Sequence, residues 1–539
     1  MVGRALGRCP EALSCAGNAL DRTARMAHNA AMLLIFPPIA KACEPPAGIA
    51  RLASALHAHG IPCRVLDANL EGQLWLMKQP LPANDTWTRR AGKNLARNLA
   101  ALYDRETYRS PDRYSRAVRE VNRVLAVAAR GSGTTLGLAD YQHEKLSPLR
   151  SSDLVKAAQH PEQNPFFRWF SARLRHILAD ATHAPVRVVG FSLNYLSQAL
   201  CTFAMIGFIR SEFPALRISL GGGLATSWLQ RPGWQNPFGN LVDQLVAGPG
   251  ERPLLSLFGV DGLPDRHVTP DYSVLPHHEY LSPGFILPYS SASGCYWNRC
   301  SFCPELAEGN RYRPVPVQRA LADLHELTAR TRPVLIHLLD NAISPALMRA
   351  LAADPPPAPW YGFARFEEEL ADADFCLALR RSGCVMLKLG LESGDQGVLD
   401  QLQKGIDLGQ ASRILTNLQR AGIAVYLYLL FGTPAETLTE ARRTLEFVVR
   451  HREAIGFMNL AIFNMPIAGD EAARHETEPF YDGDLSLYTA FRHPHGWDRK
   501  EVRLFLANEF KRHTSVAAIL KNDPPLFSSN HAAFFRTFW

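Results

Sequence analysis

The chain has 539 residues, of which 47% are hydrophobic and 20% charged, and its formal net charge is +7 at pH 7. This length allows two or three domains with sizeable cores, and the composition is that of a globular chain. The modest positive charge gives no reason to expect a nucleic-acid partner, and no apolar run approaches the roughly 20 residues that a membrane span needs.

Residues 1–28 contain Arg, Ala, Gly and Cys without the apolar core of a signal peptide, and we expect a disordered or helical extension. An apolar run at 31–36 predicts a buried strand, 48–60 a helix and 63–67 a second strand, an order that favours a parallel sheet covered by helices. We interpret residues from about 72 to 182 as a helical insertion. Strands resume at 186–193 and 217–220, and the first domain spans 29–258.

Glycines and polar residues follow the predicted strand ends of this first domain. Gly221, Gly222 and Gly223 come directly after one strand, and Gly248, Gly250 and Glu251 follow the last one. Ligands of open parallel sheets bind at the carboxyl ends of the strands, and glycine lets a ligand approach the backbone closely. Tight turns explain a glycine triplet equally well.

A proline-rich linker at 259–282 separates this domain from a second one. Between 283 and 474, six predicted strands alternate with helices, beginning with a strand at 285–291. Six such units predict a partial (β/α)6 barrel that is open on one side. The last segment, 475–539, is rich in aromatic residues, and we expect it to be small and α-rich.

Three of the ten cysteines, Cys295, Cys300 and Cys303, fall within nine positions just beyond the first predicted barrel strand. Three thiolates on one loop suit three corners of a [4Fe-4S] cluster, and no fourth cysteine lies nearby to close the last iron. A zinc site or buried cysteines are the alternatives, although zinc usually takes four protein ligands. Ten cysteines in this length are too few for a disulfide scaffold, which favours the reducing cytoplasm.

The stretch Gly-Cys-Tyr-Trp-Asn-Arg-Cys-Ser-Phe-Cys-Pro at 294–304 resembles the radical SAM superfamily, whose three cysteines have an aromatic residue, here Phe302, before the last. The sequence departs from the commonest form in having four residues, not three, in the first gap. The resemblance implies that S-adenosylmethionine (SAM) chelates the open iron. One electron, from a donor such as flavodoxin or ferredoxin, would cleave SAM to methionine and a 5'-deoxyadenosyl radical.

The first domain resembles the cobalamin-binding domain that precedes many radical SAM domains. The matching positions are Phe36, Pro38, Asp67, Ser192, Asn194, Tyr195, Gly221, Gly222, Gly223, Gly248, Gly250 and Glu251. The Asp-x-His-x-x-Gly motif of other corrinoid domains is not found, so the resemblance implies a base-off corrinoid without a histidine ligand. A Rossmann-like fold that persists without the cofactor is the alternative.

The ends of the predicted barrel strands hold further candidate residues. By the same resemblance, they line the SAM site: Asp340, Arg365, Gly390, Glu392, Gly432 and Pro434, with Lys404-Gly405 in the family pattern. An arginine fork suits a carboxylate, and Asp340 suits ribose hydroxyls. For any one of these residues, helix capping or a surface ion pair explains the position equally well.

Together these features predict an α/β protein with a Rossmann-like cobalamin-binding domain, a radical SAM barrel and a C-terminal segment. We expect an enzyme that methylates an unactivated carbon of a small-molecule, lipid or peptide substrate. A radical SAM enzyme that performs rearrangement, cyclisation or methylthiolation without cobalamin is one alternative, and a non-catalytic corrinoid sensor is another. Cys43, Cys63 and Cys201 are too scattered for the second cluster of a methylthiotransferase.

Overall fold

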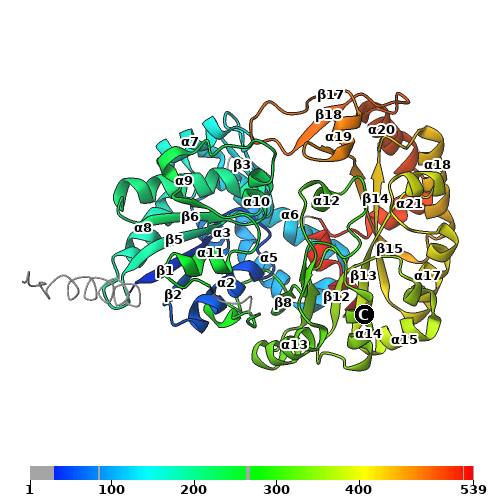
Figure 1. Cartoon of the computed structure of the whole chain (residues 1–539), viewed down its shortest axis with the longest axis horizontal. Helices are drawn as coiled ribbons and strands as arrows, with labels where there is room; N and C mark the ends of the chain where they lie inside the picture. The colour runs from blue at the N-terminus through cyan, green and yellow to red at the C-terminus, as the bar shows by residue number, and fades with distance from the viewer. Residues whose placement is uncertain (1–29, 83–84, 263–266, 526, 538–539) are drawn as a thin grey trace, which may run out of the picture.

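The computed structural model describes residues 30–537, apart from 83–84, 263–266 and 526. The expected extension at 1–28 lies outside the described residues. Figure 1 shows two α/β units side by side, the N-terminal one in blue to green and the second in green to red. The predicted fold class is confirmed.

The N-terminal unit is a doubly wound sheet of five parallel strands in the order β2-β1-β5-β6-β7. Its strands are β1 (Ala31–Phe36), β2 (Cys63–Asp67), β5 (Val186–Ser192), β6 (Arg217–Gly221) and β7 (Gln244–Leu245). Alternate residues of β1 enter different cores: Met32 and Leu34 pack with the first helix α2 (Ala47–Ala58) and with α11 (Glu251–Ser256), whereas Leu33 and Ile35 pack with α9 (Leu196–Glu212). Because both of its faces are buried, β1 is apolar throughout.

The insertion between β2 and β5 is mainly helical, as expected. Its helices are α3 (Ala68–Met77), α4 (Thr86–Lys93), α5 (Leu95–Tyr103), α6 (Pro111–Ala128), α7 (Ser151–Gln159) and α8 (Phe167–Leu178). It also contains an antiparallel hairpin, β3 (Thr134–Leu136) with β4 (Tyr141–His143), that the sequence analysis missed. Gly207 of α9 lies so close to α7 that a Cβ there would be 1.8 Å from the carbonyl oxygen of Ala158.

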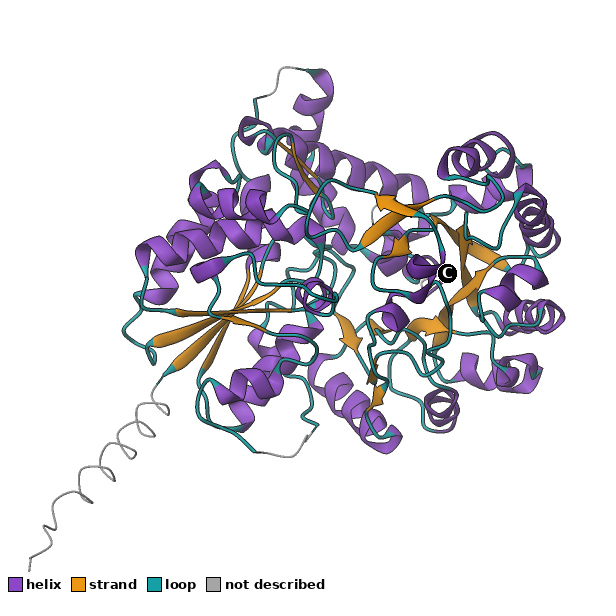
Figure 2. Cartoon of the chain, turned by 45° about the horizontal axis from the view of Figure 1, so that its top comes forward, coloured by secondary structure: helices purple, strands orange, loops and turns teal. Residues whose placement is uncertain are grey.

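The second unit has six parallel strands in the order β8-β11-β12-β13-β14-β15, with no pairing between β8 and β15. The strands are β8 (Ile286–Tyr289), β11 (Leu335–Leu338), β12 (Trp360–Ala364), β13 (Cys384–Glu392), β14 (Ala424–Phe431) and β15 (Ile455–Ile462). The helices form an outer ring (Figure 2): α13 (Val317–Thr331), α14 (Pro345–Ala353), α15 (Ala373–Arg381), α16 (Gln396–Gln401), α17 (Leu408–Ala421) and α18 (Leu438–Arg450). This is the expected open barrel.

The C-terminal segment contains helices and a three-stranded antiparallel sheet, β16-β18-β17, that was not expected. One strand of this sheet, β16 (Met465–Pro466), and the helix α19 (Asp470–Arg474) lie before residue 475, at the end of the predicted barrel domain. The elements of the segment itself are β17 (Thr477–Pro479), β18 (Tyr488–Phe491), α20 (Arg499–Phe505), α21 (Thr514–Lys521), α22 (Ser528–His531) and α23 (Phe534–Thr537). The last helix returns to the insertion, where the Phe534 and Phe535 rings lie 5.3 Å and 5.7 Å from the Tyr108 ring. The chain end therefore ties the two units together.

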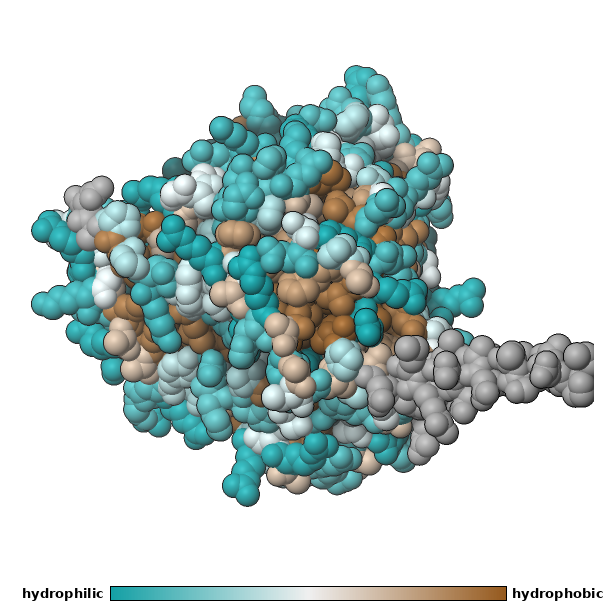
Figure 3. All heavy atoms as spheres, turned by 90° about the vertical axis from the view of Figure 1, so that its left-hand side faces the viewer, coloured by the Kyte–Doolittle hydropathy of each residue, from teal (hydrophilic) through white to brown (hydrophobic). Residues whose placement is uncertain are grey.

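Figure 3 looks onto the end of the N-terminal unit that is remote from the barrel. Hydrophobic residues gather near the middle of this face, with hydrophilic residues around them. Among the residues that the structure describes, no helix is long and apolar enough to cross a bilayer.

Candidate cofactor site

The cysteine loop, residues 294–312, begins and ends at a short antiparallel ribbon beyond the carboxyl end of β8. The ribbon pairs β9 (Ala292–Ser293) with β10 (Arg313–Pro314). Gly294 opens the loop with φ +71°, and a Cβ there would lie 2.6 Å from the Arg311 carbonyl oxygen. Glycine is thus needed where the two ends of the loop meet. The loop lies where barrel enzymes hold their active sites.

The three thiols differ in exposure: Cys300 is buried, whereas Cys295 and Cys303 are partly buried. Burial raises the pKa of Cys303 to about 11. It also raises the pKa of Cys300, although the nearby Lys404 and Arg365 oppose this shift. In the described part of the chain, no three His, Cys, Asp or Glu side chains already surround one point. We therefore expect cluster binding to displace the thiol protons and to turn the three side chains toward a common centre.

Trp297, in the longer first gap of the motif, fixes the loop to the turn after α16. Its indole N–H donates to the Gln403 carbonyl oxygen at 3.0 Å, and the Arg365 guanidinium lies 4.1 Å from its ring centroid. A Cβ on Gly405 would be 2.2 Å from the ring, so only glycine leaves room for Trp297. The longer first gap thus contains a residue that anchors the loop to this turn.

Glu392 and Lys404 form a buried ion pair beside the loop. Their side chains are only 13% and 10% exposed, and Lys404 Nζ lies 2.8 Å from Glu392 Oε1. A Cβ on Gly390 would come within 2.5 Å of the same Glu392 oxygen. The Lys404 ammonium also faces the Phe302 ring at 5.5 Å. The structure brings these predicted residues together around the cysteine loop.

Asp340 and Arg365 brace the same loop from neighbouring strand ends. The Asp340 carboxylate accepts from the Ser291 hydroxyl at 2.6 Å and from the Ser291 backbone N–H at 3.2 Å, just before β9. Burial raises the pKa of Asp340. Arg365 donates to the Lys404 carbonyl oxygen at 2.5 Å and to Glu367 at 3.1 Å. Their expected contacts with SAM remain predictions.

Gly432 has φ +78° and begins a turn. A buried carboxylate stabilises this turn by accepting hydrogen bonds. The Gly432 N–H donates to Glu436 Oε2 at 2.6 Å, and the Trp497 indole N–H donates to the same oxygen at 2.9 Å. Burial raises the pKa of Glu436 to about 7. Pro434 lies in this turn. Sequence reasoning missed Glu436, although its place two residues after Pro434 in the strand-end turn was a usable signal.

Gly432 also lines a pocket that the C-terminal sheet closes. The other lining residues include Phe463, Asn464, Phe491, His493 and Arg499. His493 Nε2 contacts the Thr433 carbonyl oxygen at 2.9 Å, which links this wall to the Gly432 turn. The aromatic C-terminal segment is therefore part of the wall at the carboxyl ends of β14 and β15.

At the carboxyl ends of the strands in the N-terminal sheet, several residues that were predicted to bind a corrinoid make contacts within the protein instead. Phe36, Pro38 and Ser192 are buried. Asp67 accepts from the Leu70 N–H at 2.9 Å and from the Tyr280 hydroxyl at 2.8 Å, and burial raises its pKa to about 6. These residues therefore support the carboxyl end of the sheet from inside the protein.

Local backbone geometry and packing explain most of the glycines at this end of the sheet. Gly222, with φ +106°, lies so close to Leu193 that a Cβ would be 2.4 Å from its carbonyl oxygen. Gly221 ends β6, and Gly223 begins the following helix α10 (Gly223–Leu229). The Gly223 N–H donates to Asn194 Oδ1 at 2.9 Å. Of the other predicted residues, Gly248 has a positive φ and Gly250 lies close to the Leu52 side chain. Glu251 forms an ion pair with Arg51.

Tyr195 and Leu196 differ from their neighbours because they project from the same edge. They are 56% and 38% exposed at the start of α9, just beyond the carboxyl end of β5. Large exposed apolar side chains at the ligand-binding edge of a doubly wound sheet are suited to contact a flat, largely apolar ligand.

A pocket lies between the segment of α10 in the N-terminal unit and the cysteine loop. It is lined by Ser227 and Arg231 of the N-terminal unit and by Pro304, Ala307 and Glu308, which directly follow Cys303. Gln230 donates to Asn310 Oδ1 at 3.0 Å beside it. Pro466 and Ala468, with Leu487 and Tyr488 of the C-terminal segment, complete the lining. All three parts of the chain therefore meet next to the third cysteine.

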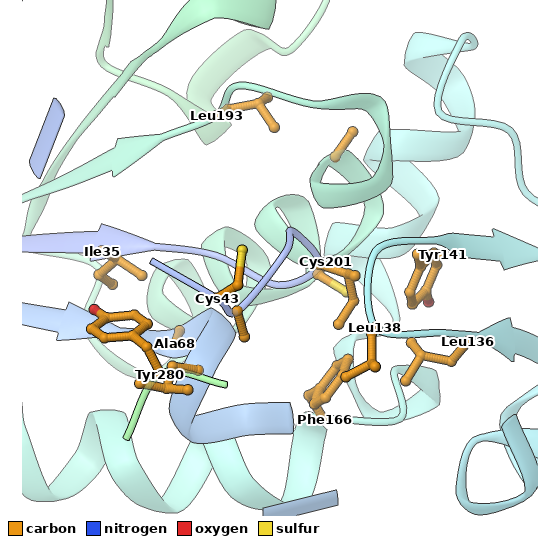
Figure 4. Packing of buried hydrophobic residues seen from close by; sticks show 14 of the residues in the cluster. Ile35, Cys43, Ala68, Leu136, Leu138, Tyr141, Phe166, Leu193, Cys201 and Tyr280 are labelled. Carbon is orange, nitrogen blue, oxygen red and sulfur yellow. The ribbon is translucent and has the colours of Figure 1, made fainter. Parts of the chain in front are cut away.

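Cys43, Cys63 and Cys201, the described cysteines of the N-terminal unit, do not gather into a second thiol group. Figure 4 shows Cys43 and Cys201 among apolar side chains of the core. Burial raises the pKa of Cys43 well above its usual value and that of Cys201 and Cys63 to about 12. Cys201 accepts a hydrogen bond from Asn164 at 3.4 Å. Cys43 and Cys201 are therefore part of the packed core.

No family model matches the chain. An uncharacterized methyltransferase of Pyrococcus horikoshii, PH0819, is 27% identical over 209 residues, which are 36% of this chain and 42% of that protein. The radical SAM methyltransferase TsrM from Kitasatospora setae, in a structure with cobalamin and a [4Fe-4S] cluster bound, matches with a TM-score of 0.50 and 15% identity over 84% of this chain and 81% of its own. The chain has the fold of TsrM.

A third match is OxsB, a cobalamin-dependent SAM radical enzyme whose structure holds aqua-cobalamin. It aligns with a TM-score of 0.47 and 12% identity over 78% of this chain and 52% of its own. The likeness to TsrM extends over both units, since it covers most of each chain. The two-unit architecture predicted from the sequence is therefore that of a known structure.

Proposed function

We propose that the chain is a cobalamin-dependent radical SAM enzyme that methylates an unactivated carbon. It would hold a [4Fe-4S] cluster on Cys295, Cys300 and Cys303, bind SAM and cobalamin, and accept electrons from a flavodoxin- or ferredoxin-type donor. One observation carries the proposal: the segment of α10, the helix that follows β6 of the doubly wound sheet, and the residues just after Cys303 line one pocket. The shared fold with TsrM and the methyltransferase relative support it.

When bound, the cluster supplies the electron that cleaves SAM, and the corrinoid supplies the methyl group. The residues of the chain position these groups and exclude water. Trp297 and Asp340 brace the cysteine loop, and the buried pair of Glu392 and Lys404 packs beside it. Tyr195 and Leu196 offer an apolar surface to the corrinoid. The substrate would be a small molecule, a lipid or a peptide.

A radical SAM enzyme without cobalamin is the second candidate. Two observations favour it: Asp67 accepts a hydrogen bond from Tyr280, and Gly222 is required by its close approach to Leu193. Neither residue needs a ligand to account for its presence. A non-catalytic corrinoid sensor would bind cobalamin without cleaving SAM. Formation of 5'-deoxyadenosine by the reduced protein would exclude the sensor.

Cobalamin binding decides between the first two candidates. We expect the anaerobic protein to bind hydroxocobalamin in a titration followed by visible spectroscopy. Replacing Tyr195 and Leu196 together by alanine is expected to weaken binding by about tenfold or more, because burial of two large side chains contributes more than about 1.4 kcal/mol.

Trp87→Ala is the matched control, because Trp87 is 52% exposed but lies on the insertion helix α4. This variant should bind like the unmodified chain. Absence of saturable binding to the unmodified protein would reject the cobalamin-dependent function and leave the second candidate.

A further inference from the structure

Glu44, His337 and Lys388 form a hydrogen-bonded chain that crosses from the N-terminal unit into the barrel. Glu44 lies in the segment after β1, whereas His337 and Lys388 belong to β11 and β13. His337 Nδ1 lies 3.0 Å from both carboxylate oxygens of Glu44, and Lys388 Nζ lies 3.3 Å from His337 Nε2. This pattern assigns the Nδ1–H tautomer to a neutral His337.

Lys388 points into the barrel, not toward the helices. Its neighbours Leu387 and Leu389 pack in the outer core with residues of α15 and α17, so the alternate residues Lys388 and Gly390 face inward. Lys388 is therefore one pleat, about 6–7 Å, deeper than Gly390 beside the cysteine loop. Its side chain is almost fully buried, at 2% exposure.

The Lys388 ammonium has unused hydrogen-bonding capacity. Of its three donors, one reaches His337, and among the described residues no other hydrogen-bond acceptor is found for it. Its remaining surroundings are the rings of Tyr361 and Phe363, whose centroids lie 4.8 Å and 4.9 Å from Nζ. An ammonium normally makes up to three hydrogen bonds, so this site lacks an acceptor.

Lys388 reaches a carboxylate only through an imidazole ring. The charged groups that act on it are Glu44 and Lys41, with the Cys43 thiol nearby. Glu44 lies behind His337, whose pKa is lowered by burial, and Lys41 is only partly buried. Burial likewise lowers the pKa of Lys388 to about 7. A buried ammonium without a carboxylate in direct contact is costly, and an anion bound against it would offset that cost.

We propose that Lys388 is a substrate-binding residue of the barrel and that it receives an oxyanion, a carboxylate or phosphate group, of the substrate. His337 and Glu44 hold the lysine in place, and the reacting carbon lies nearer to Gly390 and the cysteine loop. This inference rests on the proposed function, because it names the class of substrate for that enzyme. It predicts an anionic substrate whose charged group is several ångströms from the methylated carbon.

Glyoxylate tests the site, because it combines an aldehyde with a carboxylate. Its aldehyde condenses with a lysine amine to an imine and water, and cyanoborohydride reduces the imine to carboxymethyl-lysine, which peptide mass spectrometry locates. At pH 7.5 and low glyoxylate, we expect the full reconstituted chain to be modified first at Lys388. At this pH an amine with a pKa near 7 is mostly unprotonated, whereas only roughly 0.1% of an exposed lysine with a pKa near 10.4 is unprotonated.

Competing anions give the second arm of the test. Inorganic phosphate or acetate should slow modification of Lys388 several-fold and leave the surface lysines unaffected; the stronger competitor identifies the preferred oxyanion. Lys388→Met should lose the modified peptide, which confirms the assignment. The proposal is overturned if surface lysines react while Lys388 does not, or if neither anion protects it. Because the assay needs no SAM cleavage, its failure is separate from failure of the proposed function.

Discussion

Replacing Cys295, Cys300 and Cys303 together by alanine is expected to remove the cluster and all SAM cleavage. These three thiols lie on one short loop whose ends are fixed by the β9–β10 ribbon. Without the thiolates no soft ligands remain there for iron. We expect the unmodified chain, reconstituted anaerobically, to hold about four irons and a brown absorbance, and the triple variant to hold neither.

Cys63→Ala is the matched control, since Cys63 is also partly buried but lies in β2 of the N-terminal unit. This control should keep its iron and its formation of 5'-deoxyadenosine, measured after reduction with dithionite. If the triple variant cleaved SAM as fast as the unmodified chain, the cluster would have to be held elsewhere.

Lys404→Met is expected to destabilise the fold by about 3–5 kcal/mol, because it leaves the carboxylate of Glu392 buried without its partner. The two groups lie 2.8 Å apart and are almost completely shielded from solvent. The Lys404 ammonium also lies over Phe302, so the loop loses a contact as well. Thermal unfolding of the variant and of the unmodified chain in the same buffer measures the effect.

The double variant Lys404→Met with Glu392→Gln separates the lost charge from lost packing. It removes both charges, so it should recover most of the stability that the single variant loses. An unchanged melting temperature in the single variant would show that the pair is worth no more than a surface salt bridge, about 0–1 kcal/mol.

Local sequence patterns predicted the six barrel strands and the doubly wound sheet because these strands are apolar runs that end at glycine or polar residues. The strand ending at Phe431-Gly432 is an example: a buried run, then a glycine with positive φ. The three cysteines stand out as a candidate cluster site for a similar reason, since ligands on one loop are recognised by their close spacing along the chain.

Very short elements, and contacts between distant parts of the chain, were not predictable. The hairpin of Thr134–Leu136 with Tyr141–His143 has only three residues in each strand, too few for a periodic pattern. Likewise, Glu44 and His337 are 293 positions apart, so nothing in either local sequence indicates their contact. The role of Trp297 became visible only with Gly405, since the sequence shows the extra residue in the motif but not the turn against which it packs.

The most direct test of the central claim is the electron paramagnetic resonance spectrum of the dithionite-reduced protein, recorded before and after addition of SAM. If Cys295, Cys300 and Cys303 leave one iron free for SAM, the spectrum of the reduced [4Fe-4S] cluster will change when SAM binds. A cluster spectrum that stays identical at saturating SAM would mean that this iron is already closed by another ligand, and the proposed function would be wrong.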